Sequence, residues 1–456
     1  MRVVVTGMGV VSPVGNDLDT FWNNLKNGVC GIERIDDPQA DLLPAKVWAK
    51  VKDFNPSAYG IAPAIARRQE LFTLYALAAA SQAMEQSGLV AADKLASESG
   101  ASPKLAADKL SPESGAALKA SADKLSPESG ASVPLANIES SRLGVYMGSG
   151  IGGFDLIRRE SVKNHTDGPK WVSPTLVPSM ITNAAAGHIA IRFNAKGPAF
   201  CLSTACATGT HCIGEAYRAI KYGYADAIIA GGSEAANIPM AAAAFGNMRA
   251  LSKSDDPTRA CVPFSADRDG FVIGEGAAVL VLESYAHAVK RGAVILAEVV
   301  GYGNTCDAYH MTAPRPDATT QAAAIKDALR QAGYCGRRDV LHINAHGTST
   351  PMNDSAETAA FHLALGRNAS KAHICSTKSM TGHLLGGAGA VEAVAAVMAL
   401  REGIVPPTIG LDNPDPACDL NYTPNKAVKA PLTISLSDSL GFGGHNAAVA
   451  FRSVAV

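Results

Sequence analysis

Charged side chains are scarce in this 456-residue chain, and no long hydrophobic run takes their place. Asp, Glu, Lys and Arg make up 18% of the residues and the formal net charge is −1, whereas a soluble domain has roughly 25% charged residues. A balance so close to neutral gives no overall field that would attract nucleic acid or an anionic membrane. No run of about 18 apolar residues occurs, which argues against a membrane-spanning helix. So few charges indicate a large core or an oligomer.

Paired cysteines are also lacking. The nine cysteines are an odd number and include no Cys-x-x-Cys pair, so a disulfide framework is not indicated. Free thiols are typical of a reducing compartment, and we expect a cytoplasmic protein. The start of the chain, Met1–Gly7, has one basic residue and a very short apolar run, unlike a signal peptide.

Strand and helix signals alternate along the rest of the chain, which predicts an α/β fold with parallel-sheet character. The predicted strands are 3–5, 142–147, 225–230, 279–282, 295–300 and 340–345, and the predicted helices are 72–84, 214–221, 321–332 and 389–401. Gly7, Gly9 and Gly15 follow the first strand, but their spacing is wrong for a dinucleotide-binding loop. We interpret them as a turn that needs backbone freedom.

A low-complexity tract interrupts this pattern. Ala92-Asp93-Lys94-Leu95 recurs from residues 107 and 122, each time followed by a Glu-Ser-Gly-Ala segment. A period of 15 is shorter than that of the usual solenoid repeats. Because the tract has few large apolar side chains, we predict a surface insertion at about 91–135. A partner-binding element is the alternative.

Two pairs of matching segments indicate an internal duplication. Ser203-Thr204-x-x-x-Thr208-Gly209 matches a segment that begins 173 residues later, at Ser376. Gly274-x-x-Ala277-Ala278-Val279 matches a segment that begins 170 residues later, at Gly444. The two halves would present equivalent loops to a shared centre, which is a natural place for a site.

Cys206 is the candidate nucleophile. It falls between an apolar stretch and a helix-compatible run, at a strand-to-helix elbow. The N–H groups and positive dipole end of a helix N-terminus lower a thiol pKa and can hold an oxyanion. A small buried core cysteine is the alternative. No metal site is predicted, since the spacing of Cys201, Cys206, His211 and Cys212 matches no zinc pattern.

Two histidines could act with this cysteine. His346 stands where a strand ends and a polar loop begins, and His383 lies on the duplicate of the Cys206 loop. Lys378 precedes His383 by five residues, and Glu392 is the only acid within an apolar helix, which favours a buried ion pair between them. An ordinary loop histidine and an exposed glutamate are the alternatives. A cysteine protease needs one histidine with an Asn or Asp orienter, whereas two histidines better suit N–H donors to an enolate.

Four motifs in sequence order resemble those of β-ketoacyl-acyl-carrier-protein synthases, and most closely their type II enzymes: Thr204-Ala205-Cys206-Ala207-Thr208-Gly209, Asn344-Ala345-His346-Gly347-Thr348, Thr377-Lys378-Ser379-Met380-Thr381-Gly382-His383 and Gly441-Phe442-Gly443-Gly444-His445-Asn446. The resemblance covers the chain to about residue 451, apart from the repeats. One cysteine with two histidines separates this type from thiolases and type III synthases.

The resemblance implies a thiolase-like fold with two duplicated α/β halves, residues 1–294 and 295–456, in a five-layer αβαβα arrangement and a homodimer. It implies that Cys206 carries an acyl group and that malonyl-acyl carrier protein loses carbon dioxide and condenses with it. His346 and His383 would stabilise the enolate. No cofactor is implied, because phosphopantetheine arrives on the carrier protein; no nucleic acid or membrane partner is implied.

The resemblance also assigns supporting roles. Lys378 and Glu392 would support the histidines, and Phe442 would be the gate and, through its N–H, part of the oxyanion hole. Further assignments are pantetheine binding by Thr312, Thr348 and Thr350, the acyl pocket by Ile151 and Phe245, and carrier docking by Arg67, Arg68 and Arg249.

Two residues before the last motif depart from the family pattern. Asp438 and Leu440 stand where related enzymes often have Asn and Phe, which affects gating and chain-length preference rather than the reaction. The alternatives to fatty acid elongation are a ketosynthase of a polyketide or specialised lipid pathway and a non-catalytic partner subunit.

Overall fold

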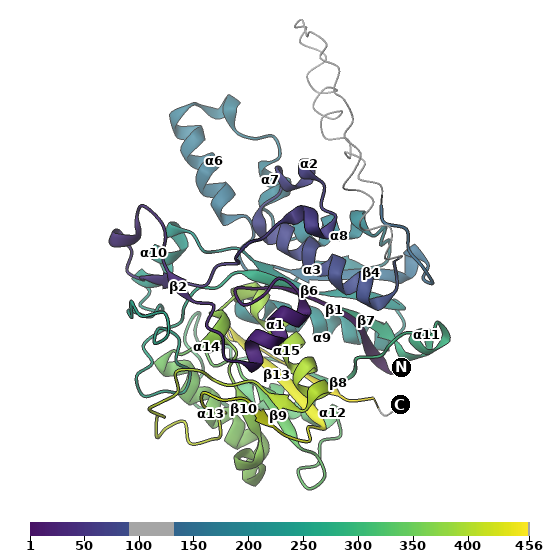
Figure 1. The fold of residues 1–456 in the computed structure, drawn as a ribbon, viewed down its shortest axis with the longest axis vertical. Coiled ribbons are helices and arrows are strands. Elements are labelled where there is room, and N and C mark those ends of the chain that lie inside the picture. Colours follow the sequence, from purple (N-terminus) through teal and green to yellow (C-terminus); the bar gives the residue numbers. More distant parts are fainter. Residues whose placement is uncertain (91–131, 455–456) are drawn as a thin grey trace, which may run out of the picture.

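A mixed β-sheet forms the centre of the computed structural model, which describes residues 1–90 and 132–454. In this part of the chain the sheet has ten strands in the order β10-β9-β13-β14-β8-β1-β7-β6-β4-β5 (Figure 1). Their bounds are β1 Val3–Val11, β4 Leu143–Gly148, β5 Ala199–Phe200, β6 Ala227–Glu234, β7 Gly276–Ser284, β8 Ala297–Cys306, β9 Leu341–Asn344, β10 His373–Cys375, β13 Ile434–Gly441 and β14 His445–Arg452. Two separate two-stranded antiparallel sheets pair β2 (Glu33–Arg34) with β3 (Val47–Trp48) and β11 (Ile404–Val405) with β12 (Val428–Lys429).

The sheet consists of two halves with the same topology, which confirms the predicted duplication. From the centre outward the first half runs β1-β7-β6-β4-β5 and the second runs β8-β14-β13-β9-β10. In each half the outer three strands are parallel and the inner pairings are antiparallel. The predicted parallel character therefore holds only for the outer strands. The matched segments at Gly274 and Gly444 lead into β7 and β14, which occupy equivalent positions.

Helices complete a five-layer arrangement. α3 (Leu71–Ser87) and α8 (Ala184–Arg192) cover the first half, and α12 (Thr319–Gln331), with α13 (Pro351–Leu365) packed on it, covers the second. Between the halves lie α9 and α15, each in contact with strands of both (Figure 1). α9 spans Thr208–Lys221 and α15 spans Ala388–Glu402. Residues 388–400 of α15 are buried on every side, as expected of a helix between two sheets, and this layer accounts for the low content of charge.

The other α-helices in the described part of the chain are α1 Leu18–Lys26, α2 Pro63–Ala66, α6 Phe154–Thr166, α7 Leu176–Met180, α10 Pro239–Asn247, α11 Tyr285–Lys290 and α14 Lys378–Thr381. All predicted strands and helices correspond to observed elements. In the described ranges, no helix combines the length and apolar character needed to cross a bilayer. The predicted repeats, in 91–131, lie outside the described residues; Val133 is buried and Leu135 bridges Val90.

Of the three glycines predicted to form a turn, Gly15 does so, since it exchanges backbone hydrogen bonds with Ser12 across residues 12–15, whereas Gly7 and Gly9 do not. Gly7 and Gly9 lie inside β1, where a Cβ atom would stand 2.0 Å from a carbonyl oxygen of α3, that of Ala83 or Ala79 respectively. These glycines let the helix backbone approach the strand more closely than a side chain would allow. The prediction of a turn at Gly7 and Gly9 was therefore wrong, because the glycines serve close packing.

Candidate active site

Cys206 lies at the elbow between β5 and α9, as predicted. It sits in a short 3-10 turn, Ala205–Ala207, directly before the first residue of α9. Ala205 adopts the left-handed conformation with φ of 50°, which is strained for a residue with a side chain. The turn is braced by Thr208, whose hydroxyl accepts the Thr204 N–H at 2.8 Å. The fold thus holds the thiol at the helix N-terminus.

The Cys206 thiol does not have the lowered pKa that its position suggested. Burial raises its pKa to about 12, although the nearby Lys378 charge and the Phe442 N–H pull it down. The side chain is only 8% exposed, and loss of hydration penalises a thiolate more than these two groups favour it. The prediction of a lowered pKa was therefore wrong in sign, because desolvation exceeds the effect of the helix end.

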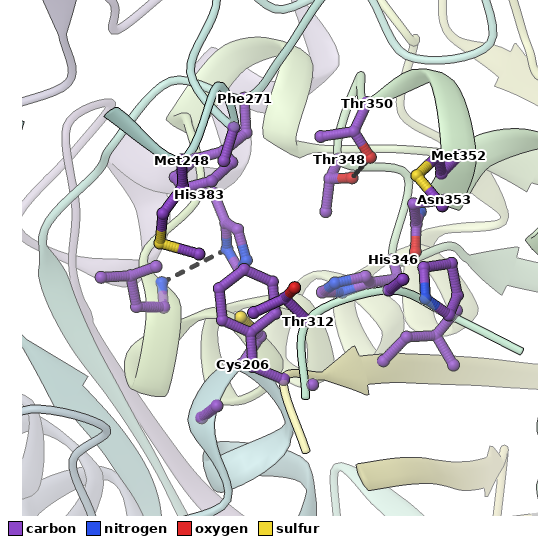
Figure 2. Close-up of a pocket in the computed structure, with 18 of the residues that line it drawn as sticks. Cys206, Met248, Phe271, Thr312, His346, Thr348, Thr350, Met352, Asn353 and His383 are labelled. Carbon is purple, nitrogen blue, oxygen red and sulfur yellow. Dashed lines mark hydrogen bonds between the residues drawn. The ribbon is translucent and has the colours of Figure 1, made fainter. Parts of the chain in front are cut away.

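His346 and His383 converge on Cys206, and the duplication had predicted this position for His383. The sulfur and one ring nitrogen from each histidine lie within 4.8 Å of one another. The two rings stand nearly perpendicular, with centroids 5.2 Å apart. Figure 2 shows both rings and the thiol on one wall of the pocket. The alternatives of a core cysteine and ordinary loop histidines do not account for this convergence.

The hydrogen bonds of the histidines fix which ring nitrogen carries the proton. Lys378 Nζ, which can only donate, lies 3.2 Å from His346 Nδ1, and the Leu385 N–H donates to His383 Nδ1 at 3.3 Å. Burial, followed by the Lys378 charge, lowers the pKa of both histidines well below the ordinary value. Both rings are therefore neutral and protonated at Nε2, the arrangement of two N–H donors.

Lys378 and Glu392 form the predicted ion pair. Lys378 Nζ donates to Glu392 Oε1, and both side chains are buried. Burial raises the pKa of Glu392, and the adjacent Lys378 charge opposes that rise. The alternative of an exposed glutamate is excluded. The pair joins α14 to α15 and directs the ammonium to His346.

A cavity of about 470 Å³ opens above the thiol and the two histidines. Its lining includes most of the residues assigned by resemblance: Ile151, Phe245, Arg249, Thr312, Thr348, Thr350 and Phe442. Thr348 and Thr350 lie side by side, with their hydroxyl oxygens 2.9 Å apart (Figure 2). Arg67 and Arg68 are exposed and do not line this cavity.

Phe442 occupies the turn between β13 and β14. Gly443 and Gly444 follow with φ of 86° and 75°, a conformation that glycine adopts without strain. The Gly443 N–H donates to the Met311 carbonyl at 2.7 Å, which ties this turn to the loop that carries Thr312. Of the two departures from the family pattern, Leu440 lines the cavity and Asp438 is buried on β13 outside it.

Sequence reasoning missed three residues that hold the site. Glu234, at the end of β6, accepts the N–H groups of Gly150, Ile151 and Gly386, and so ties the loop after β4 to the His383 loop. Phe271 packs edge-on against the His383 ring, with centroids 5.3 Å apart.

Glu357 on α13 is the third residue that holds the site, and it accepts the N–H of His346 at 2.6 Å. No local motif signals any of the three.

A metal does not suit this set of groups. Cys206, His346 and His383 are the one cluster of possible ligands found in the described part of the chain. Metal binding requires deprotonated ring nitrogens, but the partners at Nδ1 leave Nε2 protonated on both rings. The cluster is therefore set to donate hydrogen bonds.

Comparison with known proteins assigns the family. Residues 1–102 and 97–288 match the description "Beta-ketoacyl synthase, N-terminal domain", and residues 296–412 match "Beta-ketoacyl synthase, C-terminal domain". The chain is 42% identical over 452 residues to a 3-oxoacyl-[acyl-carrier-protein] synthase 2 of Synechocystis sp., covering 99% of this chain and 98% of the relative. It is also 42% identical over 456 residues to the Vibrio harveyi protein of the same name, covering 100% and 99%.

Solved structures agree with this assignment. A β-ketoacyl synthase from Burkholderia phymatum is similar with a TM-score of 0.82 and 32% identity, over 100% of both chains. A type II polyketide ketosynthase, solved in complex with its acyl-carrier protein, has the same TM-score and identity over 100% of this chain and 99% of its own. Together with the site geometry, these matches show that the chain belongs to the β-ketoacyl synthase family.

Proposed function

We propose that this protein catalyses the decarboxylating condensation of malonyl-acyl carrier protein with an acyl group held on Cys206, the elongation step of fatty acid synthesis. The observation that carries the proposal is the convergence of one thiol and two Nε2–H donors in a single cavity. A thiol can carry an acyl group, and paired donors can stabilise an enolate.

Acyl transfer comes first. The Cys206 sulfur, once deprotonated, attacks the carbonyl carbon of the acyl thioester, and the N–H groups of Cys206 and Phe442 hold the resulting oxyanion. The bond from that carbon to the pantetheine sulfur breaks, and the carrier leaves as a thiol after its sulfur takes up a proton that balances the one lost by Cys206. The Phe442 N–H already points at the Cys206 sulfur, which supports its role in the oxyanion hole.

Decarboxylation and condensation follow. The C–C bond to the malonyl carboxylate breaks, carbon dioxide leaves, and the electron pair becomes an enolate of the thioester. His346 and His383 donate to the enolate oxygen. The enolate carbon then attacks the acyl carbonyl, a C–C bond forms, the C–S bond to Cys206 breaks, and 3-oxoacyl-acyl carrier protein is released two carbons longer.

The remaining assignments extend this scheme. Lys378 and Glu392 hold the ring of His346 in its donor tautomer. Thr312, Thr348 and Thr350 bind the pantetheine arm, and Ile151 and Phe245 bound the acyl chain. The arm arrives on the carrier protein, so the reaction needs no free cofactor.

The proposed partners are the acyl carrier protein and a second copy of this chain. Arg67, Arg68 and Arg249 are the proposed docking cations for the acidic carrier. The homodimer is supported by an apolar surface at the β5 edge of the sheet, where Phe200, Tyr222 and Tyr224 are 55%, 73% and 69% exposed. Residues 1–294 and 295–456 are proposed as the two halves of each subunit.

Fatty acid elongation is favoured over a specialised pathway. The named sequence relatives share about ten percentage points more identity with this chain than the polyketide ketosynthase does. The test is to incubate the protein with acyl-acyl carrier protein and malonyl-acyl carrier protein and to identify the product. Formation of 3-oxoacyl-acyl carrier protein supports the proposal, and acyl loading without condensation contradicts it.

A further inference from the structure

Two carboxyl groups face each other behind His346, outside the substrate cavity. Asp438 lies on β13 and Glu357 on α13, and their carboxyl groups interact. Their exposed fractions are 1% and 0%. Neither residue lines the cavity, and neither is used in the reaction scheme above. Two buried carboxylates in contact repel strongly, because little water screens them.

The two carboxyl groups have very different hydrogen-bond partners. Glu357 accepts the N–H of His346 at 2.6 Å, the N–H of Gly347 at 2.8 Å and the amide of Asn353 at 3.3 Å. Apart from the contact with Glu357, no N–H or O–H group of another residue in the described part of the chain donates to either oxygen of Asp438. Donors stabilise a carboxylate, and a buried acceptor without one is costly. The negative charge therefore belongs on Glu357 and the proton on Asp438.

The charges around the pair do not compensate the repulsion between the carboxylates of Asp438 and Glu357. Lys378 of α14 is the cation near Asp438, but its ammonium already binds Glu392 of α15. Glu392 adds a negative charge that opposes ionisation of Asp438.

On the other side of the pair, Asp354 of α13 adds a negative charge beside Glu357. Asp354 is partly compensated by Arg268, at 3.8 Å. Burial and these neighbours raise the pKa of both Asp438 and Glu357.

We propose that Asp438 and Glu357 share one proton, carried by Asp438 and donated to Glu357, and that this hydrogen bond positions His346 for decarboxylation. Glu357 holds the two consecutive N–H groups that shape the turn after β9, where Gly347 has φ of 34°. Loss of the shared proton would drive the carboxylates apart and shift this turn. A misplacement of about 1 Å at a catalytic group can cost about 100-fold in rate. Asp438 and Glu357 are positioning residues, and this inference rests on the proposed function.

The test is the pH profile of malonyl decarboxylation, measured without an acyl donor so that Cys206 need not ionise. Above the pH at which Asp438 and Glu357 lose their shared proton, we expect the rate of malonyl decarboxylation by the wild type to fall by up to about tenfold per pH unit. Asp438→Asn carries an amide that donates to Glu357 at every pH, so its profile, normalised to its own rate at about pH 6, should lack this fall. Asp19→Asn, at an exposed position, is the matched control and should follow the wild type.

Infrared spectroscopy observes the proton directly and does not require an active variant. The difference spectrum between about pH 6 and about pH 9 should show loss of a protonated carboxyl C=O band, and Asp438→Asn should lack that band. An unchanged fall in rate in Asp438→Asn, a flat wild-type profile or a missing band would overturn the inference. A wild-type protein that decarboxylates at no pH would instead overturn the proposed function, and the infrared result would still decide the protonation of the pair.

Discussion

Replacement of either histidine by alanine should separate the two half-reactions. Each ring supplies one Nε2–H to the malonyl thioester oxygen, and each is about 98% buried, so water cannot readily replace the lost donor. Removal of one preorganised donor to developing charge costs about 100- to 1000-fold in rate, or about 3–4 kcal/mol. His346→Ala and His383→Ala should therefore slow malonyl decarboxylation by about that factor.

Acyl loading should fall much less in the same variants, because the proposed oxyanion hole consists of backbone N–H groups that neither substitution removes. The loss of transition-state stabilisation in the double variant should not exceed the sum of the two single losses in free energy, since the two donors act on one oxygen. His165→Ala, which replaces an exposed histidine outside the site, is the matched control.

The assay measures release of labelled carbon dioxide and formation of the acyl-enzyme separately in each variant. Loss of loading in both variants with decarboxylation preserved would refute the assignment of the histidines to the enolate. Equal loss of both half-reactions in one variant would show that its histidine instead supports the fold of the site, and circular dichroism of that variant would show whether the fold persists.

Three further predictions concern the thiol and the acyl pocket. Cys206→Ser should abolish condensation at neutral pH, since a hydroxyl is a far weaker nucleophile than a thiolate; steady-state elongation within about tenfold of the wild type would exclude Cys206 as the nucleophile. The pKa of the Cys206 thiol is raised to about 12, and only the thiolate reacts, so alkylation by iodoacetamide should accelerate about tenfold per pH unit between about pH 6 and pH 9. A plateau in the alkylation rate of the Cys206 peptide, followed by mass spectrometry, would contradict the raised pKa. Ile151→Phe should shorten the longest acyl chain that loads while malonyl decarboxylation persists, because Ile151 lines the cavity; unchanged loading of long chains would remove it from the pocket.

The sequence predicted most of the fold and the reacting groups because their signals are local. The elbow at Cys206 follows from an apolar strand followed by a helix, and the convergence of the Cys206 and His383 loops follows from the duplicated segments. Glu392 was predicted to be buried and paired because it is the only acid within an apolar helix, and a buried acidic side chain is rare without a partner. The glycines of β1 were misread, since the α3 backbone that they accommodate lies more than 60 residues away in sequence.

The remaining features depend on contacts that no single-sequence pattern reveals. Glu234 reaches the N–H of Gly386 across 152 positions, and Asp438 interacts with Glu357, a residue of another element that is distant in the sequence. The pKa of Cys206 could not be predicted from its helix end alone, because the degree of burial, which dominates it, is set by the surrounding tertiary structure.

Mass spectrometry of the protein after incubation with acyl-acyl carrier protein, before and after addition of malonyl-acyl carrier protein, tests the central claim most directly. We predict an acyl adduct on the peptide that contains Cys206, its disappearance when malonyl-acyl carrier protein is added, and the appearance of a 3-oxoacyl chain two carbons longer on the carrier. An acyl adduct on another residue, or an adduct on Cys206 that malonyl-acyl carrier protein does not discharge, would contradict the account.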